Sequence, residues 1–181
     1  MLVRAQVSNN DTQLSNGMTI PQIQLGLYMM SRIEAKKSVG WALGIGYRGF
    51  DCAQMYHNER EAGKAISDFL SSSDNKDGLK REDVFYTTKL SSNSTNYAAV
   101  RKSIKNSVDV SGLGYVDLFL LHSPYGGKEA RLTSWKALED AVNDGEVRMA
   151  GVSNYGVAHV STSWFQTPMA PKLTVGTRSR S

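Results

Sequence analysis

Polar side chains able to do acid–base chemistry follow four predicted strands, at the point where each strand ends. They are Asp51 with Tyr56, Lys89, His122, and Ser153 with Asn154. Each has an ordinary structural explanation when taken alone, as a turn residue, a solvated strand end, a buried core histidine or a helix cap. The carboxyl ends of strands are where α/β folds place their chemistry. Their recurrence on successive strands therefore predicts one shared site.

The elements that must position these residues alternate between short apolar segments and amphipathic ones. Ser31 and Glu34 have the spacing of a capping box, which begins a helix. Asn58 is expected to cap the next helix, with Glu61 in the same reciprocal role. Strand and helix alternate about five times, which predicts an α/β fold with a parallel sheet and right-handed crossovers. The expected strands cover residues 23–29, 47–53, 84–90, 116–121 and 147–152.

Two glycine-containing segments near the N-terminus make further predictions. Asn16 and Gly17 lie between short mixed segments, within 14–21, and predict a small β-hairpin that could plug or cover the fold. Gly26 interrupts an otherwise apolar strand pattern. A glycine there would let the backbone come close to a ligand or to a neighbouring strand.

A glycine hexapeptide, residues 44–49, matches the dinucleotide-binding pattern G-x-G-x-x-G letter for letter. That pattern binds phosphate only where it follows a strand and opens a helix. Here it ends a helix and opens a strand, so we interpret it as a helix terminus. The motifs S-x-x-K and S-D-N, which share Ser73, fall on one polar loop, and we interpret them as chance matches.

Composition narrows the class of protein. The 181 residues are 40% hydrophobic and 21% charged, which is typical of one globular domain or part of a larger one. Cys52 is the single cysteine, so no intrachain disulfide can form and a reducing, cytoplasmic setting is expected. No apolar run is long enough to span a membrane. Three of the four net positive charges come from Lys172, Arg178 and Arg180, and without a basic stripe no nucleic-acid partner is expected.

Four motifs together resemble the aldo-keto reductase family, with its microbial and fungal members nearest. The family fold is a (β/α)₈ TIM barrel that binds NADP(H) without a Rossmann motif, which agrees with the interpretation of the glycine hexapeptide. The resemblance covers about Leu14 to His159 and implies a partial barrel with an N-terminal hairpin. The motifs are F-D-C-A-x-x-Y-x-N-E at 50–59, T-K-L at 88–90, L-L-H-S-P at 120–124 and G-V-S-N at 151–154.

The resemblance implies a catalytic tetrad of Asp51, Tyr56, Lys89 and His122. A carbonyl that receives a hydride develops negative charge on its oxygen, and a positioned acid must neutralise that charge. A free tyrosine, with a pKa of about 10, is a weak proton donor near neutrality, and a nearby ammonium assists it by favouring the phenolate. Tyr56 would then be the proton donor and Lys89 the cation. Asp51 would hold Lys89 in place, and His122 would direct the substrate oxygen.

The same resemblance implies binding roles around the tetrad. Ser153 and Asn154 match positions that hold the nicotinamide carboxamide, and Gly26 and Asp51 are further expected cofactor contacts. Tyr28 matches an aromatic wall of the substrate pocket, which Tyr56 and His122 would complete. The implied substrate is a small carbonyl compound, reduced to an alcohol. No metal site is expected, and no oligomeric state is predicted.

The chain departs from the family near its end. We expect a polar tail over 1–13, the N-terminal part of the barrel over 14–160, and a divergent, irregular tail over 161–181. A truncated gene model, a frameshift or a mis-spliced exon would give such a tail, and the last strand would keep an open edge. The alternatives to a reductase are an inactive barrel fragment that lacks the rest of the cofactor site, or a non-catalytic binding subunit.

Overall fold

The computed structural model describes residues 11–14, 17–160 and 174–175. Two short strands, β1 (Asp11–Gln13) and β2 (Thr19–Pro21), pair antiparallel. The predicted hairpin is therefore confirmed, although it begins at Asp11, inside the segment expected to be a tail.

A parallel sheet of six strands follows, in which every strand lies beside the next one along the chain. This unpermuted order, with a helix after each of the longer strands, is that of consecutive units of a (β/α)₈ barrel, so the predicted partial barrel is confirmed. The strands are β3 (Leu25–Gly26), β4 (Gly49–Asp51), β5 (Phe85–Leu90), β6 (Val116–Leu121), β7 (Val147–Val152) and β8 (Thr174–Val175).

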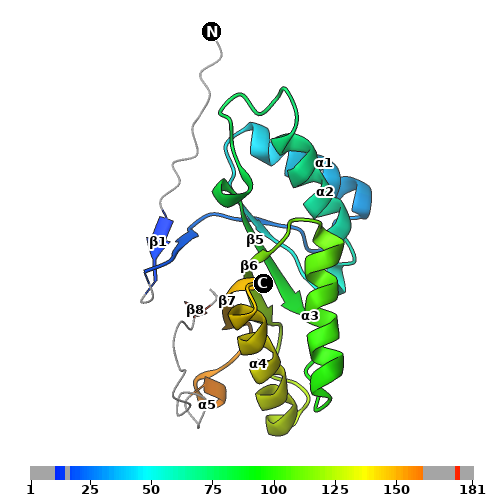
Figure 1. The fold of residues 1–181 in the computed structure, drawn as a ribbon, viewed down its shortest axis with the longest axis vertical. Helices are drawn as coiled ribbons and strands as arrows, with labels where there is room; N and C mark the ends of the chain where they lie inside the picture. The colour runs from blue at the N-terminus through cyan, green and yellow to red at the C-terminus, as the bar shows by residue number, and fades with distance from the viewer. Residues whose placement is uncertain (1–10, 15–16, 161–173, 176–181) are drawn as a thin grey trace.

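The four long helices line one side of this sheet, and the hairpin lies on the other (Figure 1). The four long helices pack in chain order, each against the next. Among the described helices, none is long and apolar enough to cross a membrane. The helices are α1 (Arg32–Gly44), α2 (Glu59–Leu70), α3 (Tyr97–Ser111), α4 (Gly127–Asn143) and the short α5 (Val157–Val160), with 3₁₀ turns η1 (Gln54–Tyr56) and η2 (Arg81–Asp83).

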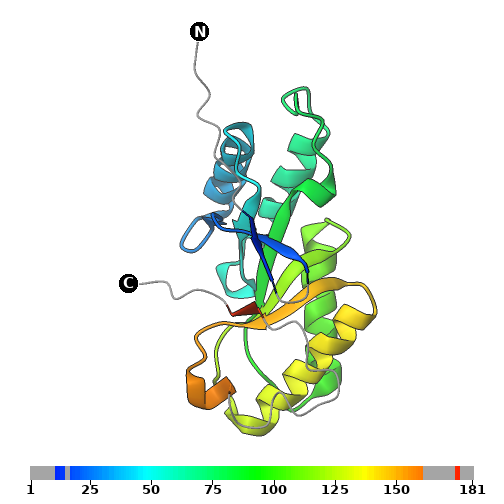
Figure 2. The same cartoon turned by 90° about the vertical axis from the view of Figure 1, so that its left-hand side faces the viewer.

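Two apolar clusters hold the layers together. The larger one fills the space between sheet and helices, where Phe50, Ile66, Ile104 and Leu138 are fully buried. The smaller one lies on the inner face of the sheet, where Leu14, Met18 and Ile20 of the hairpin segment pack on four side chains. The hairpin crosses this face in Figure 2. It therefore covers part of the apolar surface that an incomplete barrel would otherwise expose; the four side chains are Phe85, Leu118, Leu120 and Met149.

The buried carboxylate of Asp117 connects the amino-terminal ends of the central strands β5 and β6. Asp117 is 2% exposed, and its carboxylate accepts from Arg81 at 2.7 Å and from the Tyr86 backbone N–H at 2.9 Å. Arg148 is a second cation, 3.6 Å away. Burial raises the pKa of the Asp117 carboxyl, and the two guanidiniums oppose that rise. The cluster lies at the end of the strands opposite Lys89, so it is a structural feature.

Three local expectations need correction. The strand predicted over 23–29 is reduced to the two residues of β3, because its partner β4 offers only three residues for pairing. Asn58 does precede α2, but its side chain makes no cap hydrogen bond, so the capping box with Glu61 is wrong. Thr174–Val175 form β8 on the edge of β7, within the segment expected to be irregular, so β7 is paired over Gly151 and Val152. The remainder of residues 161–181 lies outside the described part.

The Asn58 amide makes contacts that no local pattern could reveal. It is fully buried and donates to Leu27 O and Met30 O, both at 3.0 Å. The Cys52 thiol donates to Asn58 Oδ1 at 3.1 Å. Buried carbonyls without a donor are costly, so the loop at 27–30 takes the amide in preference to the helix end. This amide joins the loop that bears Tyr28 to the segment that bears Tyr56.

Candidate active site

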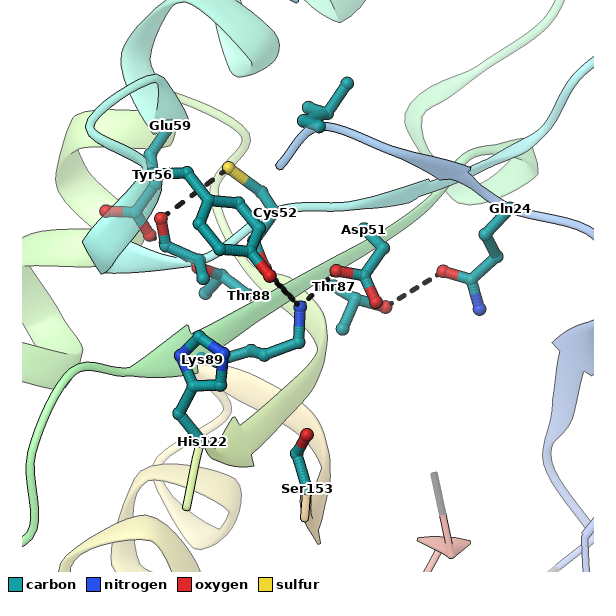
Figure 3. Close-up of polar contacts among 12 residues, drawn as sticks. Gln24, Asp51, Cys52, Tyr56, Glu59, Thr87, Thr88, Lys89, His122 and Ser153 are labelled. Carbon is teal, nitrogen blue, oxygen red and sulfur yellow. Dashed lines mark hydrogen bonds and ion pairs between the residues drawn. The ribbon is translucent and has the colours of Figure 1, made fainter. Parts of the chain in front are cut away.

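The parallel strands bring the predicted catalytic side chains together. Asp51 ends β4, Tyr56 lies in η1, Lys89 is the penultimate residue of β5, and His122 directly follows β6. In Figure 3 the Tyr56 hydroxyl and the Asp51 carboxylate both point at the Lys89 ammonium, with His122 beside them. The sequence expectation that these four would converge agrees with this geometry.

Lys89 is the centre of the arrangement. Its side-chain ammonium forms an ion pair with Asp51 and donates to Cys52 O at 2.9 Å and to Tyr56 Oη at 3.3 Å. The residue is 5% exposed, so little water screens its charge. A buried ammonium needs such partners to remain charged. The geometry therefore places a fixed positive charge within hydrogen-bonding distance of a phenol oxygen.

Tyr56 lines a cleft of about 850 Å³. Its ring is 5.1 Å from the ring of Tyr28 and 5.9 Å from the imidazole of His122, centroid to centroid. All three residues expected to contact substrate thus line the same cleft. Sequence reasoning missed Met55 and Tyr125, which are 56% and 80% exposed and also line it. Neither belongs to a pattern that would have marked it.

The surroundings of His122 favour its neutral form. Burial lowers the pKa of its imidazole, the charge of Lys89 lowers it further, and the carboxylate of Asp51 partly opposes both. Its Nδ1 atom is buried without a hydrogen-bond partner among the described residues. A neutral imidazole can donate a hydrogen bond to a substrate oxygen from one nitrogen. An imidazolium would instead compete with Tyr56 as the proton donor.

We expect an imidazole titration to show this shift directly. By NMR, the midpoint of His122 should fall below the ordinary value of 6.5, and Lys89→Met should raise it by removing the neighbouring cation. Unfolded chains would bind this proton more readily than folded ones, so stability contributed by His122 is lost as pH falls below the unfolded pKa. Loss of the signal in His122→Gln assigns it among the three histidines. A midpoint at or above 6.5 would contradict the buried, neutral imidazole.

A second cavity, of about 500 Å³, lies between the hairpin segment and the sheet, and Lys89 is among the residues that line it. Three of the four residues expected to contact a cofactor line it, namely Gly26, Asp51 and Ser153. A Cβ atom added to Gly26 would meet nothing within 4 Å. The space in front of Gly26 is thus open to a ligand, and no neighbouring strand requires a glycine there.

Asn154, the fourth expected cofactor residue, lines the cleft rather than this cavity. Its backbone is left-handed, with φ of 62°, and its side-chain Nδ2 donates to His122 O at 2.9 Å. Asn154 therefore helps to hold His122 in place, while its neighbour Ser153 lines the second cavity. The two adjacent residues reach the tetrad from different sides.

These linings fit one end of a nicotinamide dinucleotide. Hydroxyl and amide groups from Ser153 and Asn154, with the open space at Gly26, suit an uncharged carboxamide ring. Among the described residues that line the two cavities, Lys89 is the sole cation, and it forms an ion pair with Asp51. Binding the pyrophosphate and the 2′-phosphate calls for further cationic or N–H donors. The described linings thus offer polar groups for a carboxamide but no cluster of cations for the phosphates.

Cys52 is adjacent to Asp51 but takes no part in this chemistry. Its thiol is fully buried, and burial raises its pKa to about 12. A nucleophilic cysteine needs a lowered pKa, so a thiolate reaction is excluded here. His57 and His159, which had no expected role, lie outside the tetrad; His159 Nδ1 accepts from the backbone N–H of Gly156 at 3.0 Å.

Comparisons with known proteins agree with this geometry. The model of the aldo/keto reductase family matches residues 21–170, past the point where the sequence resemblance was expected to end. An uncharacterized oxidoreductase of Schizosaccharomyces pombe is 49% identical over 148 residues, which are 82% of this chain and 51% of that protein. A 9,11-endoperoxide prostaglandin H2 reductase of Trypanosoma cruzi is 35% identical over 91% of this chain and 55% of its own.

Solved structures give the same result. The crystal structure of an aldo/keto reductase from Brucella melitensis superposes with a TM-score of 0.75 at 36% identity, covering 83% of this chain and 56% of that one. A Bombyx mori aldo-keto reductase, in complex with NADP, superposes with a TM-score of 0.74 at 31% identity, covering 85% and 54%. This chain therefore spans about half the length of the relatives that it matches.

Proposed function

Because the chain belongs to the aldo/keto reductase family, we propose that it carries the catalytic tetrad of an NADP(H)-dependent carbonyl reductase, with Tyr56 as proton donor to an aldehyde or ketone. The observation that carries this proposal is the contact of Lys89 Nζ with Tyr56 Oη at 3.3 Å, beside the ion pair of Lys89 with Asp51. A reduced nicotinamide would supply the hydride.

The side chains of the tetrad would bind the carbonyl oxygen and supply its proton. A carbonyl oxygen that enters the cleft between Tyr28 and His122 would approach Tyr56 Oη. As negative charge grows on that oxygen, the phenolic proton moves from Tyr56 Oη to it, and the charge of Lys89 stabilises the phenolate left behind. Asp51 keeps Lys89 in position, and neutral His122 donates a hydrogen bond that orients the oxygen.

The cofactor proposal is NADP(H), held at its nicotinamide end by Gly26, Asp51, Ser153 and Asn154. It is supported by the family and by the NADP complex of the Bombyx mori relative. Since the described linings lack a basic cluster, a chain of this length would bind the cofactor more weakly than a protein that also supplies phosphate contacts. The alternative is a barrel fragment that does not bind NADPH at all.

One experiment distinguishes a reductase that binds NADPH from a barrel fragment that does not. We expect the purified chain to consume NADPH in the presence of an activated aldehyde such as 4-nitrobenzaldehyde, measured by the loss of NADPH absorbance. NADPH binding is titrated separately by fluorescence. A chain that is folded by circular dichroism but shows neither binding nor turnover would leave the fragment as the explanation.

A substitution at Gly26 tests where the nicotinamide lies. Gly26→Leu should fill the open space at this residue and weaken NADPH binding by at least about tenfold, while the free energy of unfolding stays nearly unchanged. Gly44→Leu is the matched control, because it adds the same side chain to a helix end where a Cβ also meets nothing within 4 Å. Equal NADPH affinity in the two variants would place the cofactor elsewhere.

A further inference from the structure

The turn that holds Tyr56 has little support of its own. It is a single 3₁₀ turn of three residues, and Ala53 before it offers no side-chain cap. Its local backbone hydrogen bonds are those from Tyr56 N to Ala53 O at 2.9 Å and from His57 N to Gln54 O at 3.2 Å. Lys89 comes from a different element, β5, so the distance between the two catalytic side chains depends on how the turn is attached to that strand.

Gln54, the first residue of the turn, makes that attachment. Its Oε1 accepts from the backbone N–H of Ser91 at 2.8 Å, two residues beyond Lys89. Its Nε2 donates to Ser107 Oγ at 2.9 Å and to Ser103 Oγ at 3.0 Å, both on α3. A carboxamide is suited to this position because it presents an acceptor and a donor at once.

These contacts join the turn that bears Tyr56 to the segment that bears Lys89 at a second place, in addition to the contact between the two catalytic side chains. Tyr56 meets Lys89 on one side of the turn, and Gln54 is bound to the segment after Lys89 on the other. Ser107 is fully buried, so its bond to the amide is shielded from competing water. The family motif at 50–59 leaves position 54 unspecified, and the structure shows what this chain places there.

We infer that Gln54 is a positioning residue whose side-chain amide sets the contact between Tyr56 and Lys89. The inference rests on the proposed function for its catalytic meaning, but the geometric claim stands apart from turnover. Small displacements of reacting groups are expensive, since about 1 Å of misplacement can cost about 10²-fold in rate. Losing the amide should therefore reduce catalysis.

The contact can be measured without any reaction. Lys89 Nζ lies 5.0 Å from the centroid of the Tyr56 ring, so wild type should show a nuclear Overhauser effect between the ring protons and the lysine ε-methylene. In Gln54→Met, which keeps the length but removes both hydrogen-bonding groups, this signal should fall at least twofold. Exchange of the Ser91 amide proton should become at least tenfold faster.

Two further variants make the test specific. Gln54→Glu keeps an acceptor for Ser91 N–H but loses the donor to Ser103 and Ser107, so both signals should lie between those of Gln54→Met and wild type. If Gln54→Met fails to fold, wild-type signals in Gln54→Glu would overturn the inference. Ser111→Ala removes a buried hydroxyl that donates to Val108 O at 2.8 Å on the same helix, away from the turn. It should lower stability and leave the Tyr56–Lys89 signal unchanged.

The kinetic measurement separates positioning from general destabilisation. In Gln54→Met, kcat should fall by about 10²-fold with little change in KM for the aldehyde, whereas Ser111→Ala should change neither. Wild-type signal and Ser91 protection in both Gln54 variants would overturn the inference. A wild-type chain without turnover would instead defeat the reductase proposal, and the magnetic resonance comparison would still decide the role of Gln54.

Discussion

Replacing Tyr56 with phenylalanine is expected to lower kcat for carbonyl reduction by about 10²–10⁴-fold, the range that a positioned acid contributes. The substitution removes the oxygen that meets Lys89 Nζ at 3.3 Å and keeps the ring that packs beside Tyr28 and His122. NADPH affinity should stay within about twofold of wild type, because Tyr56 lines the cleft and not the second cavity, where Gly26 and Ser153 lie. The measurements are steady-state kinetics and a cofactor titration.

Tyr28→Phe is the matched control for this prediction. It removes a hydroxyl from the neighbouring ring of the same cleft, 5.1 Å away, and leaves the aromatic wall in place. We expect its kcat to stay within about threefold of wild type, since an exposed hydroxyl outside the tetrad transfers no proton. Equal losses in the two variants would mean that Tyr56 acts through packing, and the assignment of the proton donor would be withdrawn.

The site could be foreseen from the sequence because its chemistry follows the strand ends. Asp51, Lys89 and His122 lie at or next to the carboxyl end of a strand. The apolar residues of each strand and the turn residues around it allow its boundaries to be predicted from the sequence. In a parallel sheet all strands run in the same direction, so their carboxyl ends lie next to one another at the same end of the sheet. No long-range information was needed for that step, which is why the convergence of these side chains could be expected from the sequence.

The support around the site could not be foreseen, because it depends on contacts between distant segments. Asn58 had the sequence signature of a helix cap, yet its amide binds carbonyls at Leu27 and Met30. Gln54 reaches Ser91 and Ser107 in the same way. An amide has several possible partners, and which of them it takes is decided by buried groups that would otherwise stay unsatisfied. Local patterns contain nothing about those groups.

The other large expected effect concerns packing behind the site. Gly63→Ala should lower the free energy of unfolding by about 3 kcal/mol, the upper end of what overpacking usually costs. A Cβ at Gly63, in α2, would lie 1.9 Å from Ser111 O and 2.7 Å from Ser111 C, in α3. Both are backbone atoms, so no side-chain rotation can relieve the clash. Urea unfolding followed by circular dichroism measures the change.

Gly40→Ala is the control, because Gly40 is also inside a helix but a Cβ there meets nothing within 4 Å. It should stabilise the chain by about 0.5–1 kcal/mol through the lower conformational entropy of alanine in the unfolded state. Opposite signs for one chemical change would show that the approach of the helices, rather than glycine itself, sets the stability at Gly63. A loss below about 0.5 kcal/mol at Gly63 would mean that α2 and α3 can separate freely. Since α2 follows the turn that holds Tyr56 and α3 follows the strand that holds Lys89, such freedom would also deny the site a fixed geometry.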